Sequence, residues 1–141
     1  MTMPKTIEDI LSDFDVVDDW EERYRYIIDL GRKMPAMPDS MKTQANKVQG
    51  CASQVWIKAT ASEDRKTITF EGDSDAMIVR GLIALLMVIY SGQTASFIIA
   101  TDVRKILARL GLDSNLSQQR SNGLNSMIEC IRADANTLLQ N

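Results

Sequence analysis

Residues 55–90, VWIKATASEDRKTITFEGDSDAMIVRGLIALLMVIY, contain the pattern that decides the fold. Apolar and polar side chains alternate over residues 55–61 and again over 67–72, which is typical of two half-buried strands. The polar residues 62–66 join these runs into an antiparallel hairpin. Two strands alone are marginally stable, so a third short strand or helices packed on one face must complete the structure.

The second half of this stretch predicts a buried helix. Gly72 to Asp75 end the second strand and offer residues that can cap a helix. Residues 76–90 are then apolar on nearly every side, interrupted only by Arg80 and Gly81, and the run is too short to cross a bilayer. The expected architecture is therefore α+β, with a small antiparallel sheet packed against this helix and the terminal helix.

The rest of the chain predicts further helices on both sides of this stretch. A capping box at Thr6 to Asp9 begins an amphipathic helix, and the acids Asp18 and Asp19 begin a second, which Pro35 prevents from continuing beyond Met34. The remaining expected elements are a long polar loop from Pro35 to Gly50 with one helical turn, and helices at residues 94–100, 101–110 and 121–140.

Length, composition and charge indicate one folded domain over residues 1–141. The chain has 45% hydrophobic and 25% charged residues, as soluble globular proteins do. Its net charge of −3 disfavours a nucleic-acid partner, because phosphate binding needs clustered Lys and Arg. Residues 1–7 have one lysine and no apolar core of a signal peptide, and no run is long enough to span a membrane. We expect a cytoplasmic protein.

The absence of histidine is the most restrictive feature of the composition. It excludes Ser-His and Cys-His catalytic pairs, an imidazole base and zincin motifs. The two cysteines, Cys51 and Cys130, are too few for a zinc site of four thiolates or a cluster held by one chain. We expect no metal and no cofactor on this chain.

The two cysteines occupy different settings. Cys130 falls at the border of the apolar stripe of the terminal helix, where a cysteine usually acts as a small hydrophobe. Cys51 follows Gly50 at the point where a polar loop becomes a strand, where backbone amides can face a thiolate and a loop tip can move. Position alone leaves both a reactive and a structural role open for Cys51.

A resemblance to a known family favours the reactive role. Residues 46–56, NKVQGCASQVW, resemble the signature of the SufE family, the sulfur-acceptor partners of cysteine desulfurases. The resemblance continues in residues 72–76, GDSDA, in 79–82, VRGL, and in 116–124, LSQQRSNGL, so it spans most of the chain. Gln118 is a departure, because the family usually has proline there.

The resemblance implies a function, partners and a fold. Cys51 would accept persulfide sulfur from a cysteine desulfurase of the SufS or CsdA type and pass it to an iron–sulfur scaffold complex. The desulfurase, and not this chain, would hold pyridoxal phosphate. The implied fold is that of SufE and of IscU-type scaffolds, and both a monomer and a homodimer remain open. Burial of Cys51 in an apolar pocket until docking would protect a persulfide.

Several further residues are candidates for supporting roles. Lys47 or Arg120 could stabilise a Cys51 thiolate or persulfide, although most charged side chains are merely solvated. Asp73, Ser74 and Asp75 are read first as helix caps, and the resemblance implies that their segment helps to dock the desulfurase. Gln54 and Trp56 lie in the signature but carry no assigned chemistry.

Two other functions compete with sulfur transfer. A binding-only regulator would change the rate of a desulfurase without accepting sulfur, so that Cys51 would be dispensable. A scaffold that assembles a cluster on itself is less compatible with the sequence, since such proteins use several cysteines with carboxylate or histidine ligands.

Overall fold

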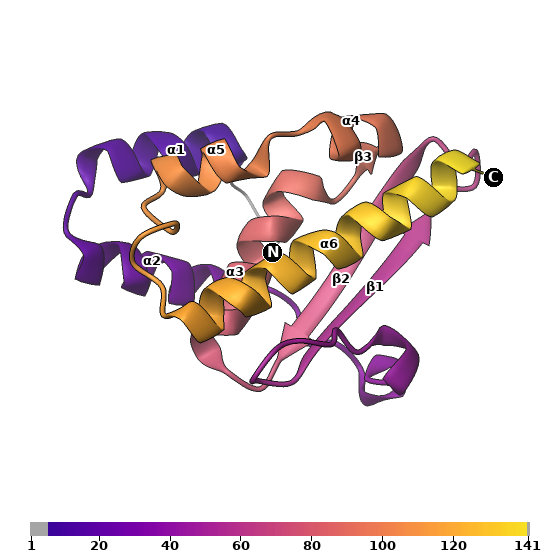
Figure 1. Ribbon diagram of the computed structural model, residues 1–141, viewed down its shortest axis with the longest axis horizontal. Helices are drawn as coiled ribbons and strands as arrows, with labels where there is room; N and C mark the ends of the chain where they lie inside the picture. The colour runs from indigo at the N-terminus through magenta and orange to yellow at the C-terminus, as the bar shows by residue number, and fades with distance from the viewer. Residues whose placement is uncertain (1–5, 141) are drawn as a thin grey trace.

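The structure is a computed structural model that describes residues 6–140 (Figure 1). The described chain folds in the order α1 (Ile7–Val16), α2 (Trp20–Lys33), the 3-10 turns η1 (Asp39–Met41) and η2 (Gln44–Asn46), β1 (Val55–Ala61), β2 (Thr67–Ser74), α3 (Met77–Tyr90), β3 (Gln93–Thr94), α4 (Ala95–Ala100), α5 (Val103–Arg109) and α6 (Gln118–Gln140). The predicted α+β class is confirmed.

The sheet has three antiparallel strands in the order β1-β2-β3. The predicted hairpin is present, with Val55 opposite Ser74 and Ala61 opposite Ile68. A third short strand, one of the two ways in which the hairpin was expected to be completed, is present as β3, which pairs with Thr67 and Ile68 at the start of β2. The second strand runs two residues further than its alternation predicted, because Asp73 pairs with Trp56 across the ladder.

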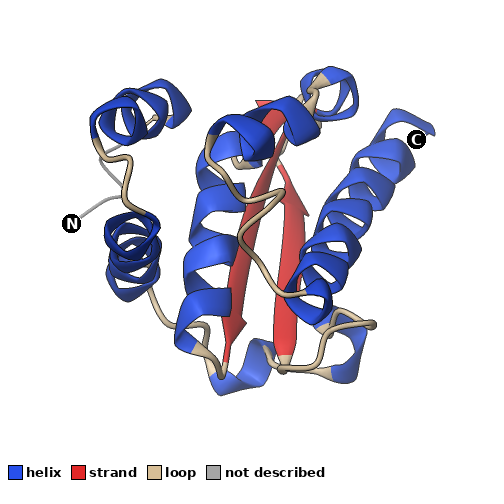
Figure 2. Cartoon of the chain, turned by 60° about the vertical axis from the view of Figure 1, so that its left-hand side comes forward, coloured by secondary structure: helices blue, strands red, loops and turns tan. Residues whose placement is uncertain are grey.

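Helix α3 lies at the centre of the molecule. Eleven of its fourteen residues are buried, and it packs against α2, β2 and α6. Figure 2 shows α3 and α6 flanking the strands, with α1 and α2 in an outer layer beyond α3. The prediction of a buried central helix at 76–90 is therefore confirmed.

The two residues that interrupt the apolar run of α3 fit it to α2. A Cβ on Gly81 would lie 2.2 Å from the carbonyl oxygen of Ile27, so the two helices approach at a distance that only glycine permits. Next to it, the Arg80 guanidinium donates to the carbonyl oxygens of Gly31 and Met34, at the C-terminal end of α2. Arg80 thus binds the C-terminal carbonyl groups of α2, and Gly81 allows the α2 backbone to pack closely against α3.

The predicted caps are partly confirmed. Thr6 forms the expected capping box with Asp9, and Asp19, one of the two acids expected to begin the second helix, caps α2. The cap expected for α3 is wrong, since its N-cap is Ala76 and no side chain caps it. Asp73 and Ser74 belong to β2 instead, and the amide of Ala76 donates to Ser74 Oγ at 3.2 Å.

Two other elements differ from expectation. The loop after α2 contains two 3-10 turns where one helical turn was expected, and α6 begins three residues earlier than predicted, at Gln118.

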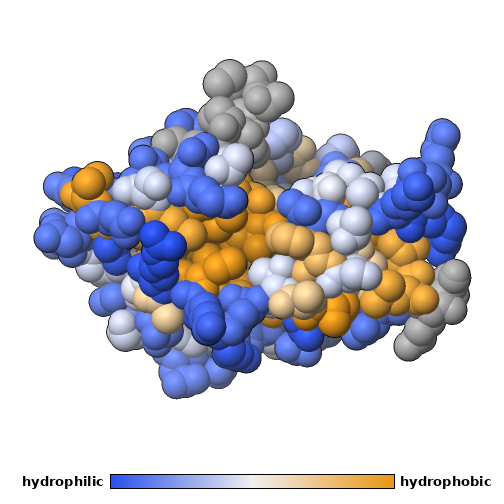
Figure 3. All heavy atoms as spheres, turned by 90° about the horizontal axis from the view of Figure 1, so that it is seen from above, coloured by the Kyte–Doolittle hydropathy of each residue, from blue (hydrophilic) through white to orange (hydrophobic). Residues whose placement is uncertain are grey.

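The surface has one prominent apolar area. On the face that carries α1, α4 and α5, apolar side chains gather in a hollow with hydrophilic rims (Figure 3). A helix that crosses a bilayer must be both long and apolar. None of the described helices has both the length and the apolar composition that this needs.

Candidate functional site

Cys51 lies in a short loop whose two ends are fastened together. The amide of Val48 donates to the carbonyl oxygen of Val55 at 2.8 Å, and Lys47 forms a β-bridge with Trp56. Residues 49–54 therefore project from a closed base without regular secondary structure. The amide of Gln54 also donates to Asp75 Oδ1 at 3.0 Å, which ties the last residue of this loop to the segment before α3.

The loop rests on α6 through Gly50 and Cys51. Gly50 has a φ of +88°, a conformation that favours glycine, and a Cβ there would lie 2.6 Å from Ser126 Oγ. The Cys51 thiol donates to the carbonyl oxygen of Gly123 at 3.6 Å, a long contact even for sulfur. Gly50 and Cys51 therefore contact α6 about one helical turn apart.

Beside the thiol is a cavity of about 230 Å³. The first turn of α6 and the start of α3 form its walls, and its lining residues are Cys51, Ala52, Ser53, Val79, Ser117, Gln119, Arg120, Gly123 and Met127. Val79 and Met127 supply apolar surface, but the seryl, glutamine and arginine side chains do not. The expectation of an apolar pocket is therefore only half right, because polar side chains complete the lining.

The thiol is not activated in the free protein. Partial burial raises the pKa of Cys51 above its ordinary value, because withdrawal from water disfavours the thiolate. Within the described residues, neither Lys47 nor Arg120 offsets this shift in pKa. Arg120 is exposed at the cavity, whereas Lys47 is half-buried at the loop base and does not line the cavity. At neutral pH the resting Cys51 is a protonated thiol.

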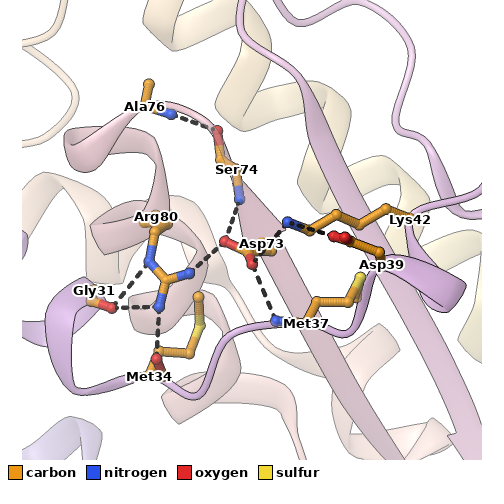
Figure 4. A network of polar contacts seen from close by, with 9 residues as sticks. All are labelled: Gly31, Met34, Met37, Asp39, Lys42, Asp73, Ser74, Ala76 and Arg80. Atoms are coloured by element: carbon orange, nitrogen blue, oxygen red, sulfur yellow. Dashed lines mark hydrogen bonds and ion pairs between the residues drawn. The ribbon is translucent and has the colours of Figure 1, made fainter.

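Asp73 is the centre of a buried polar network (Figure 4). The residue is 3% exposed. Its carboxylate accepts from the amides of Met37 and Ser74 and is paired with Arg80 on one side and Lys42 on the other. Burial alone would raise the pKa of Asp73, but the two amides and the guanidinium outweigh it and lower this pKa. Asp73 therefore holds the segment that leads from α2 toward the Cys51 loop.

The three residues proposed for docking are placed differently. Asp73 and Ser74 are buried, at 3% and 8% exposure, while Asp75 is exposed. The Asp75 carboxylate also accepts the Gln54 amide, as described above. The docking role stays a prediction, and of these three side chains only that of Asp75 is available to a partner.

Two residues on α6 and one on β1 add to what the sequence motif indicated. Gly123 and Ser126 form the seat of the loop, and neither was singled out from the sequence. Trp56, to which the sequence assigned no chemistry, is half-buried and has the Lys42 ammonium 5.4 Å from the centroid of its ring. A glycine inside a long helix was the one available signal for Gly123, since glycine weakens a helix interior unless close packing requires it.

Cys130 lies on the same helix as this seat. It is half-buried, and its pKa is raised first by burial and then by the charges of Asp134 and Cys51. Burial also raises the pKa of Asp134 itself. Among the described residues, no three His, Cys, Asp or Glu side chains gather as they would around a metal ion.

A larger cavity, of about 410 Å³, lies along β2 and away from Cys51. Met34, Met37, Phe70 and Met87 form much of its wall, and Glu71 is the one charged residue among those that line it. No cysteine is among the residues described as lining it, so this cavity offers no thiol, unlike the one beside Cys51.

Comparisons with known proteins cover nearly the whole chain. The SufE family, described as an Fe-S metabolism associated domain, matches residues 8–135. An uncharacterized SufE-like protein of Rhizobium meliloti is 49% identical over 132 residues, which cover 92% of this chain and 94% of that protein. One of Rhizobium etli is 50% identical over 132 residues, with 92% and 89% covered.

Among solved structures, a hypothetical protein from Thermus thermophilus superposes with a TM-score of 0.76. The match covers 96% of each chain at 16% sequence identity. At that identity the likeness shows a shared fold and no more.

Proposed function

Since this chain belongs to the SufE family, whose domain is associated with Fe–S metabolism, we propose that it accepts and carries sulfur on Cys51. Sulfur would come as a persulfide from a cysteine desulfurase that holds pyridoxal phosphate, and would be delivered for iron–sulfur cluster assembly. Binding would also stimulate the desulfurase. The observation that carries the proposal is the thiol on a fastened loop tip, next to a cavity large enough to hold another sulfur atom.

The transfer step is a thiol–disulfide exchange. The Cys51 thiolate attacks the outer sulfur of the desulfurase persulfide, a new bond joins Cys51 Sγ to that sulfur, and the desulfurase cysteine leaves as a thiolate. No external oxidant or reductant is needed. Because only the thiolate attacks and burial raises the pKa of Cys51, the loop must leave its seat or meet a proton acceptor in the complex before transfer.

The seat on α6 supports a gate of this kind. In the resting state the Cys51 S–H group donates to the Gly123 carbonyl oxygen, which stabilises the protonated form. Gly50, at a φ of +88°, adjoins Cys51 and provides a point about which the loop can turn. Docking of the partner would expose the thiol, and reseating would place the outer sulfur in the cavity.

Exposed side chains support a docking surface around this cavity. Arg120 lies at the start of α6, Asp75 lies just before α3, and Met77, at the first position of α3, is 54% exposed. A guanidinium beside the cavity would also favour the negative charge of a persulfide. Lys47 is half-buried at the loop base, which supports a lesser role for it.

Mass spectrometry tests the proposal against the binding-only regulator. The protein is incubated with desulfurase, pyridoxal phosphate and cysteine, then quenched rapidly and weighed intact. Transfer predicts a gain of about 32 Da for one sulfur, which disappears in Cys51→Ser and persists in the matched variant Cys130→Ser. An unmodified wild-type protein that still accelerates the desulfurase would leave only the regulator.

A further inference from the structure

The second thiol of the chain, Cys130, lies on the same face of α6 as the residues that contact the Cys51 loop. Cys130 follows Gly123 by seven residues, so at about 100° per residue the two positions differ by only about 20° around the helix. Their separation along the axis is about 10 Å, or nearly two turns. Ser126, which lies under Gly50, is one turn from Cys130.

The position of Cys51 Sγ on α6 is fixed by its contacts with Gly123. It lies 3.6 Å from the Gly123 carbonyl oxygen and 3.5 Å from the place that a Cβ on Gly123 would take. Helical Cα–Cβ bonds tilt toward the N-terminus, so the side chain of Cys130 leans back toward Cys51. The electrostatics agree with this proximity, since an ionised Cys51 raises the pKa of Cys130.

Movement of the loop along α6 can close the remaining gap. A disulfide needs Cα atoms roughly 4.4–6.8 Å apart, which requires Cys51 to slide toward Cys130 by about one helical turn. The backbone at Gly50 already contacts the helix at Ser126, one turn further on than the Cys51 contact at Gly123. The seat can therefore guide Cys51 toward Cys130.

We propose that Cys130 discharges a persulfide on Cys51. The Cys130 sulfur attacks the inner sulfur of the persulfide, Cys51 Sγ, and the bond from Sγ to the outer sulfur breaks. The outer sulfur leaves with the bonding electrons as hydrosulfide, and a Cys51–Cys130 disulfide forms. The outer sulfur is reduced and Cys130 is oxidised. The proton of the Cys130 thiol passes to the outer sulfur, which therefore leaves as HS⁻. The step needs no other reactant.

The surroundings of Cys130 keep this step slow. Burial, the Asp134 carboxylate and Cys51 all raise its pKa, so only a small fraction is thiolate at neutral pH. A docked recipient therefore receives the sulfur first, and discharge takes over when no recipient arrives. The product is the chain with a Cys51–Cys130 disulfide and no carried sulfur. A dithiol reductant returns this product to the starting state.

The test loads sulfur without a desulfurase. Reduced protein is treated with inorganic tetrasulfide, desalted and followed by intact mass and by free sulfide. Wild type is expected to begin about 32 Da above the reduced protein and to end about 2 Da below it, with one sulfide released per chain. Cys130→Ser is expected to keep its added sulfur at least tenfold longer.

Three results would overturn the proposal. They are equal lifetimes of the added sulfur in wild type and Cys130→Ser, sulfur recovered on Cys130, and a disulfide that joins two chains. Cys130→Ala guards against a folding artefact, because it must also retain the sulfur and give the wild-type melting temperature. Oxidation of the unloaded protein with diamide is an independent measurement, and must give an intramolecular disulfide that Cys130→Ser lacks.

The inference rests on the proposed function only in that Cys51 must hold a persulfide. Because tetrasulfide replaces the desulfurase, the two can fail separately. If the Cys51–Cys130 disulfide forms after chemical loading but a desulfurase adds no sulfur, only the proposed function is overturned. If a desulfurase adds sulfur but the disulfide does not form, only this inference is overturned.

Discussion

Gly50 lies over Ser126 so closely that a Cβ would come within 2.6 Å of the Ser126 hydroxyl oxygen. Gly50→Ala should therefore lift the loop from α6, and the positive φ adds a backbone cost of about 1 kcal/mol. We expect Cys51 to alkylate with iodoacetamide several-fold faster in this variant. The reaction is followed by mass spectrometry in a Cys130→Ser background.

Gly92→Ala is the matched control for this change. Gly92 has a φ of +80°, but a Cβ there would meet nothing within 4 Å, so the backbone cost is the same and the collision is missing. Alkylation of Cys51 should keep its wild-type rate in Gly92→Ala. Equal acceleration in both variants would mean that strain, and not the seat, controls access to the thiol.

The pH dependence of alkylation separates burial from charge. Because burial raises the pKa of Cys51, the midpoint of its alkylation profile should lie above that of the same protein unfolded in urea, which is about 8.5. Arg120→Ala and Lys47→Ala should leave the folded midpoint unchanged. A midpoint that rises in either variant would show that the cation stabilises the resting thiolate after all.

Asp73→Asn should be among the most destabilising single polar changes. It leaves the partly buried Arg80 guanidinium without its counter-charge, a loss of about 3 kcal/mol in the free energy of unfolding. Asp39→Asn is the control, since its side chain is fully exposed and its 3.7 Å pair with Lys42 should be worth less than about 0.5 kcal/mol. Urea unfolding of both variants measures the difference, and similar midpoints would contradict the assigned role.

Asp73 also predicts how stability depends on acid. Its folded pKa is lowered, so its contribution is complete above the unfolded value, about 3.9, and is lost as the pH falls toward the folded pKa. Wild type should lose stability below about pH 4, and Asp73→Asn should lose less over the same range. Parallel losses in the two proteins would assign the acid sensitivity to other carboxylates.

Gly81→Ala tests the contact between α2 and α3. Its Cβ would lie 2.2 Å from the Ile27 carbonyl oxygen, so the helices must separate, at a cost of about 3 kcal/mol in the free energy of unfolding. Thermal unfolding of Gly81→Ala is compared with that of the wild type, because Gly81 has no positive φ and its replacement adds the collision without that backbone cost. Equal melting temperatures would show that the two helices separate at little cost.

Local pattern predicted most of the fold, because strand alternation and helix periodicity are encoded by neighbouring residues. The hairpin and the buried helix followed from residues 55–90, and even Arg80 and Gly81 were visible as interruptions. The contacts that these two residues make could not be predicted, because their partners on and after α2 lie about fifty residues away in the sequence. The capping assignment failed for a similar reason, because Asp73 binds the distant Lys42 ammonium and Met37 amide as well as the nearer Arg80.

The candidate site divides in the same way. Cys51 was identifiable from its motif, and Gly50 from its place before it, but their seat on α6 joins residues more than seventy positions apart. Nothing in the spacing of Gly123 and Ser126 marks them as that seat. The sign of the Cys51 pKa shift was equally hidden, because it depends on burial and not on the nearby lysine.

The fastened base of the loop fixes how far the sulfur can travel. Val48 and Gln54 are each held by hydrogen bonds, and Cys51 is three residues from either. A chain of three residues spans at most about 10 Å when fully extended, so Cys51 moves on a short double tether. Any protein that exchanges sulfur with it must bring its own reacting atom to within that radius, and a donor whose sulfur lies deep in a cleft must extend it outward.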